Sequence, residues 1–157
     1  MSDLAQILTD REKMTVFAEA MLEKYPDAAQ RAKELPVDHC FSPGVYGRVL
    51  HIPAGNIIVG RIHKEPCLNI LLCGDIVIRM DDGSKARMSA PFVFKSEAGR
   101  QKIGVALTDT VWMTVHPNPA DETDPDKLVA LYTVDTFEQF DALQAEKQKA
   151  LAQGDRQ

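Results

Sequence analysis

The stretch between Val45 and His116 is a succession of short apolar runs separated by turn residues. Val and Ile, which favour strands, are frequent in the runs, while Gly, Pro and Asp fill the gaps. No segment of helical length separates neighbouring runs, and this excludes a parallel sheet with crossover helices. The pattern predicts an all-β sandwich or barrel. The expected strands are 46–52, 56–63, 67–73, 75–80, 92–95, 101–108 and 111–116.

Helical segments are expected on both sides of this region. On the N-terminal side, Thr9 and Glu12 have the spacing of a capping box, and an apolar stripe at helical spacing follows. A second short helix is expected over 28–34. The stripe can cover one side of the barrel or form a dimer surface, and covering the barrel is the commoner role of such stripes.

The C-terminal side begins with an acidic, proline-containing loop. Residues 127–134 fit a last strand or a short helix equally well. Thr136 and Gln139 form another capping-box pattern ahead of an apolar helix, and the chain is expected to fray beyond about residue 147.

The length of 157 residues predicts one domain. Its expected parts are a helical segment over 1–40 that packs on the barrel, the barrel over 41–118, and the loop and helix over 119–157 that complete the domain.

Charge and composition exclude several classes of partner. The net charge of -5 and a pI near 5.3 argue against binding to nucleic acid or to an anionic membrane. No apolar run approaches the roughly 18 residues that span a bilayer. The first residues lack the pattern of a signal peptide, and the three cysteines are odd in number, so reduced thiols in a cytoplasmic compartment are expected.

Candidate ligand residues gather around the turn between two expected strands. Because side chains alternate along a strand, Arg61 and His63 share a face, and Cys67 and Asn69 share a face of the next strand. Imidazole and thiolate ligands suit zinc, iron, copper or nickel, and the predicted cofactor is a divalent transition metal: zinc, iron, manganese or nickel. The candidate metal ligands are His63, Cys67, His51 and His116.

Structural roles compete with each of these assignments. His63 fits a pocket-rim histidine that bonds a backbone carbonyl, and His51 and His116 fit satisfied structural histidines. Cys67 fits a buried apolar thiol as well as a ligand, and Cys73 is expected to be such a buried thiol. Trp112 is expected in the core with its indole N–H bonded.

A motif in this region resembles the first motif of the cupin family, in which a His-x-His pair precedes a Glu, six residues and a Gly. Counting back from Gly74 places Cys67 at the Glu position, His63 at the second histidine and Arg61 at the first. The stretch 98–102 is similar to the second cupin motif, with Lys102 at its histidine position. The resemblance covers about residues 41–118. It implies a mainly β fold, a single cupin-type jelly-roll barrel with N-terminal and C-terminal helices.

Within that family the chain resembles small cupin-like proteins of tailed bacteriophages and prophages. The likeness is carried by H-K-x-x-x-L-N-I-L and A-L-T-D-T-V-W-x-T-V-H. It implies a location in the bacterial host cytoplasm or in a virion. The family resemblance, together with the N-terminal apolar stripe, leads us to expect a homodimer.

The motif departs from the family at two positions that carry cations. Arg61 and Lys102 would repel a divalent metal if their side chains pointed at it. The same cations could bind a small anionic ligand, because a guanidinium holds carboxylate or phosphate in a bidentate manner. In that case the ligand-binding residues are Arg61, His63, Asn69 and Lys102.

Three functions are compatible with these observations. The first is a phage- or prophage-type cupin-fold protein that binds a small ligand or metal in the barrel, with catalysis left open. The second is a non-catalytic virion, structural or accessory oligomeric protein. The third is a phage regulator or anti-defence protein that captures an anionic metabolite. The sequence identifies no catalytic residue.

Overall fold

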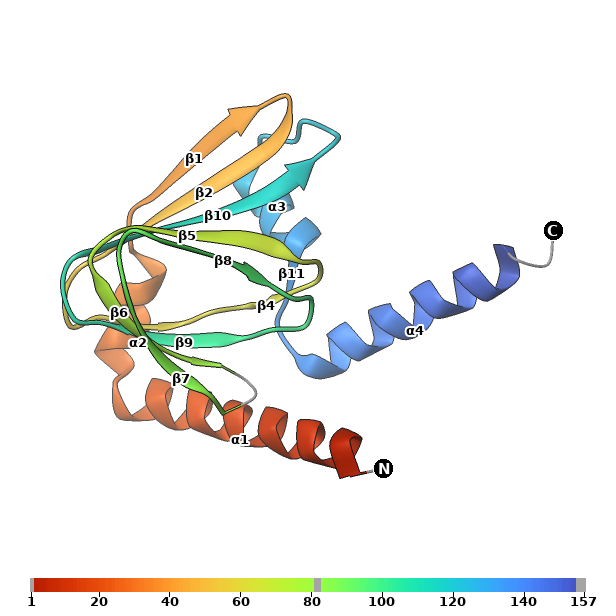
Figure 1. Cartoon of the computed structure of the whole chain (residues 1–157), viewed down its shortest axis with the longest axis horizontal. Coiled ribbons are helices and arrows are strands. Elements are labelled where there is room, and N and C mark those ends of the chain that lie inside the picture. The colour runs from red at the N-terminus through yellow and green to blue at the C-terminus, as the bar shows by residue number, and fades with distance from the viewer. Residues whose placement is uncertain (1, 81–82, 155–157) are drawn as a thin grey trace.

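The computed structural model describes residues 2–80 and 83–154, and in these residues two antiparallel sheets face each other (Figure 1). The first sheet contains, in spatial order, β1 (Val37–Ser42), β2 (Gly44–Ile52), β10 (Thr110–Asn118), β5 (Cys67–Cys73) and β8 (Phe92–Ser96). The second contains β3 (Ile57–Val59), β9 (Lys102–Ala106), β6 (Asp75–Met80) and β7 (Lys85–Ser89). A short pair joins β4 (Ile62–His63) to β11 (Thr133–Val134).

The strand order is that of a jelly roll. Leaving β1 aside, β2, β10, β5 and β8 form one sheet and β3, β9, β6 and β7 the other, so the chain crosses repeatedly between the two sheets. Each strand pair is antiparallel. The predicted mainly β fold is therefore confirmed.

Two strands were absent from the sequence prediction, and both lie at sheet edges. β1 and β7 carry polar residues at half or more of their positions and are largely exposed, which is typical of edge strands. The expected strand over 56–63 is wrong in one respect, because it is broken into β3 and β4 around Gly60. Gly60 N–H donates to the carbonyl of Lys102 and the chain then leaves β9 to pair with β11.

The N-terminal helices are α1 (Ser2–Lys24) and α2 (Pro26–Lys33). Met14 and Ala18 of α1 are buried against Ile103 of β9, so the stripe covers the outer face of the second sheet. The predicted capping box at Thr9 is wrong, because α1 begins at Ser2 and Thr9 lies inside it. The residues before Thr9 are mostly good helix formers, and they extend the helix.

The C-terminal helices are α3 (Pro125–Tyr132) and α4 (Phe137–Gly154). The predicted capping box at the start of α4 is confirmed. Gln139 N–H donates to Thr136 Oγ1 at 3.2 Å, and Thr136 N–H donates to Gln139 Oε1 at 3.3 Å. The expected fraying beyond residue 147 is wrong. Lys147 pairs with Glu65, and the Ala, Gln and Lys residues that follow favour a helix to Gly154.

An apolar core lies between the two sheets of the barrel. Side chains from both sheets form this core: Ile52, Leu71, Ile76, Ile78, Ala106 and Trp112. None of the helices described in residues 2–80 and 83–154 is long and apolar enough to cross a membrane.

Candidate metal centre

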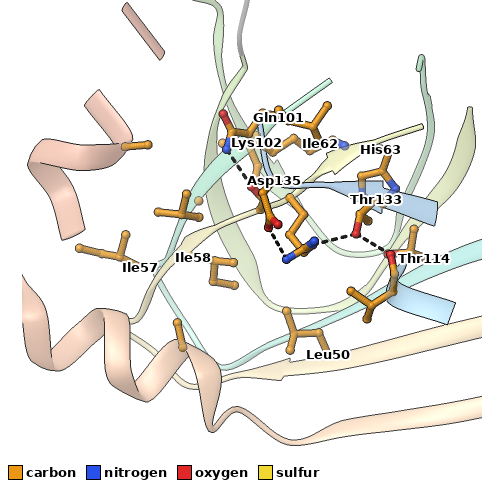
Figure 2. Close-up of a pocket in the computed structure, with 18 of the residues that line it drawn as sticks. Leu50, Ile57, Ile58, Ile62, His63, Gln101, Lys102, Thr114, Thr133 and Asp135 are labelled. Carbon is orange, nitrogen blue, oxygen red and sulfur yellow. Dashed lines mark hydrogen bonds and ion pairs between the residues drawn. The ribbon is translucent and has the colours of Figure 1, made fainter. Parts of the chain in front are cut away.

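A cavity of about 1100 Å³ is lined by side chains of the barrel and of the helices, and Figure 2 shows part of this lining. Its inner end is lined by side chains of β2, β4, β9 and β10, and its outer end by the helices. Arg11 of α1 and Asp141 of α4 form an ion pair at the outer end, with Nη1 3.0 Å from Oδ1. The interior of the barrel is therefore accessible to a small molecule.

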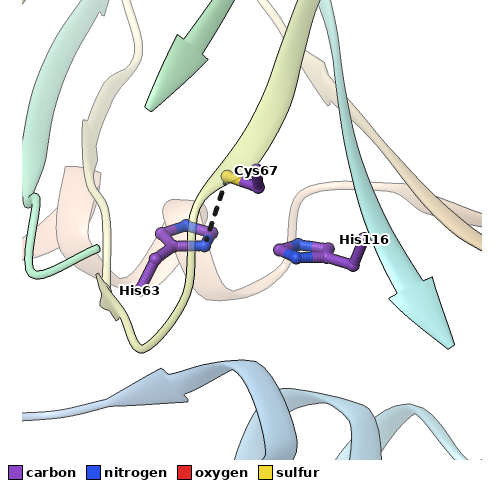
Figure 3. A group of neighbouring side chains, drawn as sticks. All are labelled: His63, Cys67 and His116. Atoms are coloured by element: carbon purple, nitrogen blue, oxygen red, sulfur yellow. Dashed lines mark hydrogen bonds between the residues drawn. The ribbon is translucent and has the colours of Figure 1, made fainter. Parts of the chain in front are cut away.

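Three potential metal ligands meet beside the cavity, and two of them, His63 and His116, line it. They come from β4, β5 and β10, and the ligand atoms of His63, Cys67 and His116 all lie within 4.8 Å of one another (Figure 3). Cys67 Sγ is 3.7 Å from His63 Nδ1. The two imidazole rings are nearly parallel, with centroids 5.5 Å apart and an interplanar angle of 10°. Cys67 and His116 are only 4% and 5% exposed.

This donor set fits a single transition-metal ion. Zinc binds nitrogen at about 2.0–2.1 Å and sulfur at about 2.3 Å, so its ligands lie roughly 3.5 Å apart, close to the observed separation of Cys67 and His63. His116 is buried, yet in the described part of the chain neither of its ring nitrogens has a hydrogen-bond partner.

The protonation states of the histidines also suit a metal ion. Burial, aided by the nearby Lys102 ammonium, lowers the pKa of His63 to about 3. Burial, aided by the Arg48 guanidinium, lowers the pKa of His116 to about 4. Both imidazoles are therefore neutral at pH 7. Burial raises the pKa of the Cys67 thiol, although Lys102 and a hydrogen bond from Asn69 act in the opposite direction.

The low histidine pKa values predict that the metal-free protein loses stability in acid. An unfolded histidine has a pKa near 6.5, so between about pH 6.5 and 4 the unfolded state binds up to two more protons than the folded state. We expect the free energy of unfolding to fall by about 2–4 kcal/mol between pH 7 and pH 5 from these two groups. Urea denaturation at both pH values measures it. The double variant His63→Gln/His116→Asn should lose less of its free energy of unfolding between pH 7 and pH 5 than the wild type. An equal loss in the two proteins would contradict the assignment of the pH dependence to these histidines.

A buried hydrogen-bond network supports the thiol side of the centre. Asn69 Nδ2 donates to Ser96 Oγ at 2.9 Å, and Trp112 Nε1 donates to Asn69 Oδ1 at 3.2 Å. Trp112 also packs edge-on against Phe94, with the core position and bonded indole N–H that were predicted for it. Asn69 lines the cavity, and its amide also contacts Cys67, Ser96 and Trp112.

The two facing sheets form a jelly-roll barrel. No family model matches the sequence, and no curated protein matches it. Solved structures similar to it include a cupin superfamily protein from Desulfitobacterium hafniense, with 15% identity over 53% of this chain and 76% of that chain and a TM-score of 0.47.

Two further similar structures are KdgF from Halomonas sp. and an RmlC-like cupin family protein from Methanocaldococcus jannaschii. KdgF has 14% identity over 57% of this chain and 81% of that chain, with a TM-score of 0.47. The M. jannaschii protein has 11% identity over 55% of this chain and 83% of that chain, with a TM-score of 0.47. The expected likeness to bacteriophage proteins has no support among these structures.

Of two further predicted site residues, His51 lies outside the barrel and Arg61 lies at the rim of the cavity. His51 is on the outer face of β2, where its Nε2 is 2.7 Å from Asp38 Oδ2, because the strand alternation that directs Tyr46 and Ile52 inward directs His51 outward. Arg61 lies at the cavity rim, where its Nη1 is 2.6 Å from Asp135 Oδ1. The break at Gly60 removes Arg61 from the face that it was expected to share with His63.

Lys102 lines the cupin cavity, as predicted, but Cys73 is not the buried thiol that was expected. A bulge shifts the pairing of β5 with β10 between Val111 and Trp112, so Cys73 loses the inward orientation of Leu71 and is exposed.

The sequence analysis missed an aromatic wall beside the two histidines. The Tyr132 ring stacks on the His116 ring with centroids 4.4 Å apart, and Tyr46 lies 6.2 Å from both rings. Tyr46 Oη is 2.8 Å from His39 Nδ1, and Tyr132 Oη donates to the carbonyl of Pro117. Strand alternation on β2 could have identified Tyr46, but Tyr132 comes from the segment that fitted either helix or strand.

Proposed function

We propose that the protein holds one transition-metal ion at His63, Cys67 and His116 and uses it to bind a small molecule in the cupin cavity. The convergence of these three ligand atoms within 4.8 Å, at the inner end of a cavity of about 1100 Å³, supports the proposal. Three protein ligands are the number found in catalytic zinc sites, where a fourth position is open to water or substrate. When bound, such an ion would polarise an oxygen atom of the bound molecule or lower the pKa of a bound water.

The thiolate narrows the choice of metal. Sulfur and imidazole ligands suit zinc, iron and nickel, whereas manganese prefers oxygen ligands. Of the two cations expected to repel a metal ion, Arg61 and Lys102, Arg61 forms an ion pair with Asp135 at the rim of the cavity. This pairing reduces the repulsion between Arg61 and a bound metal ion. The thiol must be reduced to bind metal, which agrees with a cytoplasmic location for the protein.

Elemental analysis of purified protein tests this proposal. Metal-free protein is incubated with zinc, iron(II), nickel or manganese, dialysed and analysed together with a Cys67→Ser variant. We expect about one zinc, iron or nickel ion per chain in the wild type and a clear loss in the variant. Failure of all four metals to remain bound would overturn the proposal.

A second candidate function, that of an oligomeric accessory protein, is favoured by the outer face of the first sheet. We propose that two copies of the chain pair through this face. α1 covers the outer face of the second sheet, whereas the corresponding face of the first sheet is apolar and exposed. Its exposed residues include Val45, Leu68, Leu72 and Val93, which are 42–61% exposed, and Val49, Ile70, Val111, Met113 and Val115 share the face by register.

A second copy is the partner that best fits this face. An antiparallel sheet that faces water normally alternates polar residues outward, and the central strands of this face do not. The chain carries a net charge of -5, so two copies repel each other least where each presents a mainly apolar surface. On this face the charged residues Lys95 and Asp38 lie on the outer strands β8 and β1. The N-terminal stripe cannot provide the interface, because Met14 and Ala18 are already buried.

The double variant Leu68→Glu/Val93→Glu is expected to be monomeric where the wild type is a dimer. Both side chains are exposed, so the charges oppose pairing without disturbing the barrel core. Val16→Glu/Leu151→Glu is the matched control, because these residues are 65% and 70% exposed on α1 and α4. Sedimentation equilibrium measures the mass. A monomeric wild type, or a dimeric Leu68/Val93 variant, would contradict the interface.

A further inference from the structure

The inner end of the cavity contains an arginine without a counter-ion. Arg48 lies on β2, and it shares the inward face of that strand with Tyr46 and Ile52. Its side chain lines the cavity. Within the described residues, no carboxylate forms an ion pair with its guanidinium, and no group accepts a hydrogen bond from it. The arginines at the rim differ, because Arg11 is paired with Asp141 and Arg61 with Asp135.

A threonine is paired with Arg48 on the neighbouring strand. Thr114 of β10 is the cross-strand neighbour of Arg48, is 8% exposed and lines the same cavity. Its hydroxyl has no hydrogen-bond partner in the ranges 2–80 and 83–154. Polar groups that are removed from bulk water normally find partners. Two such groups side by side therefore indicate a site for a ligand that supplies acceptors.

The electrostatic surroundings specify the charge of that ligand. Lys102 enters the cavity from β9 on the opposite sheet, and its ammonium is close enough to lower the pKa of both His63 and His116. The acidic residues that line the cavity all belong to α1, α4 or the segment after β11, at the outer end. The inner end is therefore positively charged, and a metal ion would add to that charge.

We propose that Arg48, Thr114 and Lys102 bind the carboxylate or phosphate group of a small molecule whose other end reaches the His63–Cys67–His116 centre. The inference rests on the proposed function in so far as the anion belongs to the ligand of that centre. The guanidinium offers two parallel N–H donors to an oxyanion, the hydroxyl offers a third, and the ammonium adds a point charge. The anion would neutralise the charge of Arg48, which no carboxylate among residues 2–80 and 83–154 pairs with.

Calorimetric titration with inorganic phosphate and with malonate, at constant ionic strength, tests the inference. Each titration is run on metal-free and on zinc-loaded protein. The variants are Arg48→Met and Thr114→Val, with Arg61→Met as the matched control because its guanidinium already has a carboxylate partner. We expect wild type and Arg61→Met to bind at least one of the two anions with similar affinity, and Arg48→Met to bind it about tenfold or more weakly.

Thermal unfolding of the ligand-free protein provides a second test of Arg48, and this test does not require the anion to be identified. Removing a desolvated, unpaired charge should raise the melting temperature of Arg48→Met above that of the wild type. If Arg48→Met does not fold, Arg48→Lys keeps the charge without the fork and should show the weaker anion binding in its place. Equal anion affinity in wild type, Arg48→Met and Thr114→Val, or no binding of either anion to the wild type, would overturn the inference.

The metal content of the same samples separates this inference from the proposed function. Arg48→Met should retain the wild-type zinc stoichiometry, because Arg48 is not among the three ligands. If the protein fails to retain zinc but binds an anion through Arg48, the anion site is supported and the metal centre is overturned. Stoichiometric zinc without any anion binding would do the reverse.

Discussion

Replacing His116 with alanine is expected to lower the affinity for zinc by more than about 100-fold, because even residues that only support a metal ligand are worth roughly 10–100-fold. His116 is one of the three groups that converge within 4.8 Å, and its buried ring nitrogens have no protein partner among the described residues. Its removal would leave one imidazole and one thiolate, too few for a closed site. Competition with a chromophoric zinc chelator measures the affinity.

His51→Ala is the control for this experiment. His51 is also a strand histidine, but it lies outside the barrel and pairs with Asp38, so zinc affinity should stay within about twofold of the wild type. Wild-type affinity in His116→Ala would contradict the assignment of this ligand. An equal loss in both variants would show that the effect is not local to the cavity.

Replacing Trp112 with alanine is expected to lower the free energy of unfolding by about 3–5 kcal/mol, the range for a large aromatic residue in a core. Trp112 is 8% exposed, packs edge-on against Phe94 and donates its indole N–H to Asn69. Its loss creates a cavity and also leaves the Asn69 carbonyl oxygen without its donor. Urea denaturation of the metal-free protein measures the change.

Trp112→Phe separates the two contributions to this loss. Phenylalanine retains an aromatic ring but cannot donate to Asn69, so a loss of about 1–3 kcal/mol is expected for this variant. The exposed Val16→Ala is a control that should change stability by less than about 0.5 kcal/mol. A Trp112→Ala variant as stable as this control would mean that the indole does not organise the polar half of the barrel.

Side-chain alternation predicted which residues point into the barrel wherever a strand is unbroken. β10 is regular over its length, so Trp112, Thr114 and His116 alternate inward as expected. The same rule was wrong for Arg61 and Cys73, and in both cases the backbone departs from regular pairing. Gly60 ends β3 before Arg61, and a bulge displaces Cys73.

The remaining site residues depend on contacts that local sequence does not encode. Tyr132 reaches His116 only because α3 returns over the open end of the barrel, and no periodicity in 125–132 indicates that contact. Strand alternation places Arg48 on the inward face of β2, but it was not predicted as a site residue, because an arginine in a strand is usually solvated. The case for Arg48 as a ligand-binding residue comes from the structure. Arg48 lines the cavity and, among residues 2–80 and 83–154, has no carboxylate partner of the kind that Arg61 has.

X-ray absorption spectroscopy at the zinc edge tests the central claim most directly, because it reports the atoms around the ion. The three side chains at the inner end of the barrel predict one sulfur at about 2.3 Å and two imidazole nitrogens at about 2.0–2.1 Å around the zinc of reconstituted protein. A first shell made only of oxygen and nitrogen, without sulfur, would contradict the account.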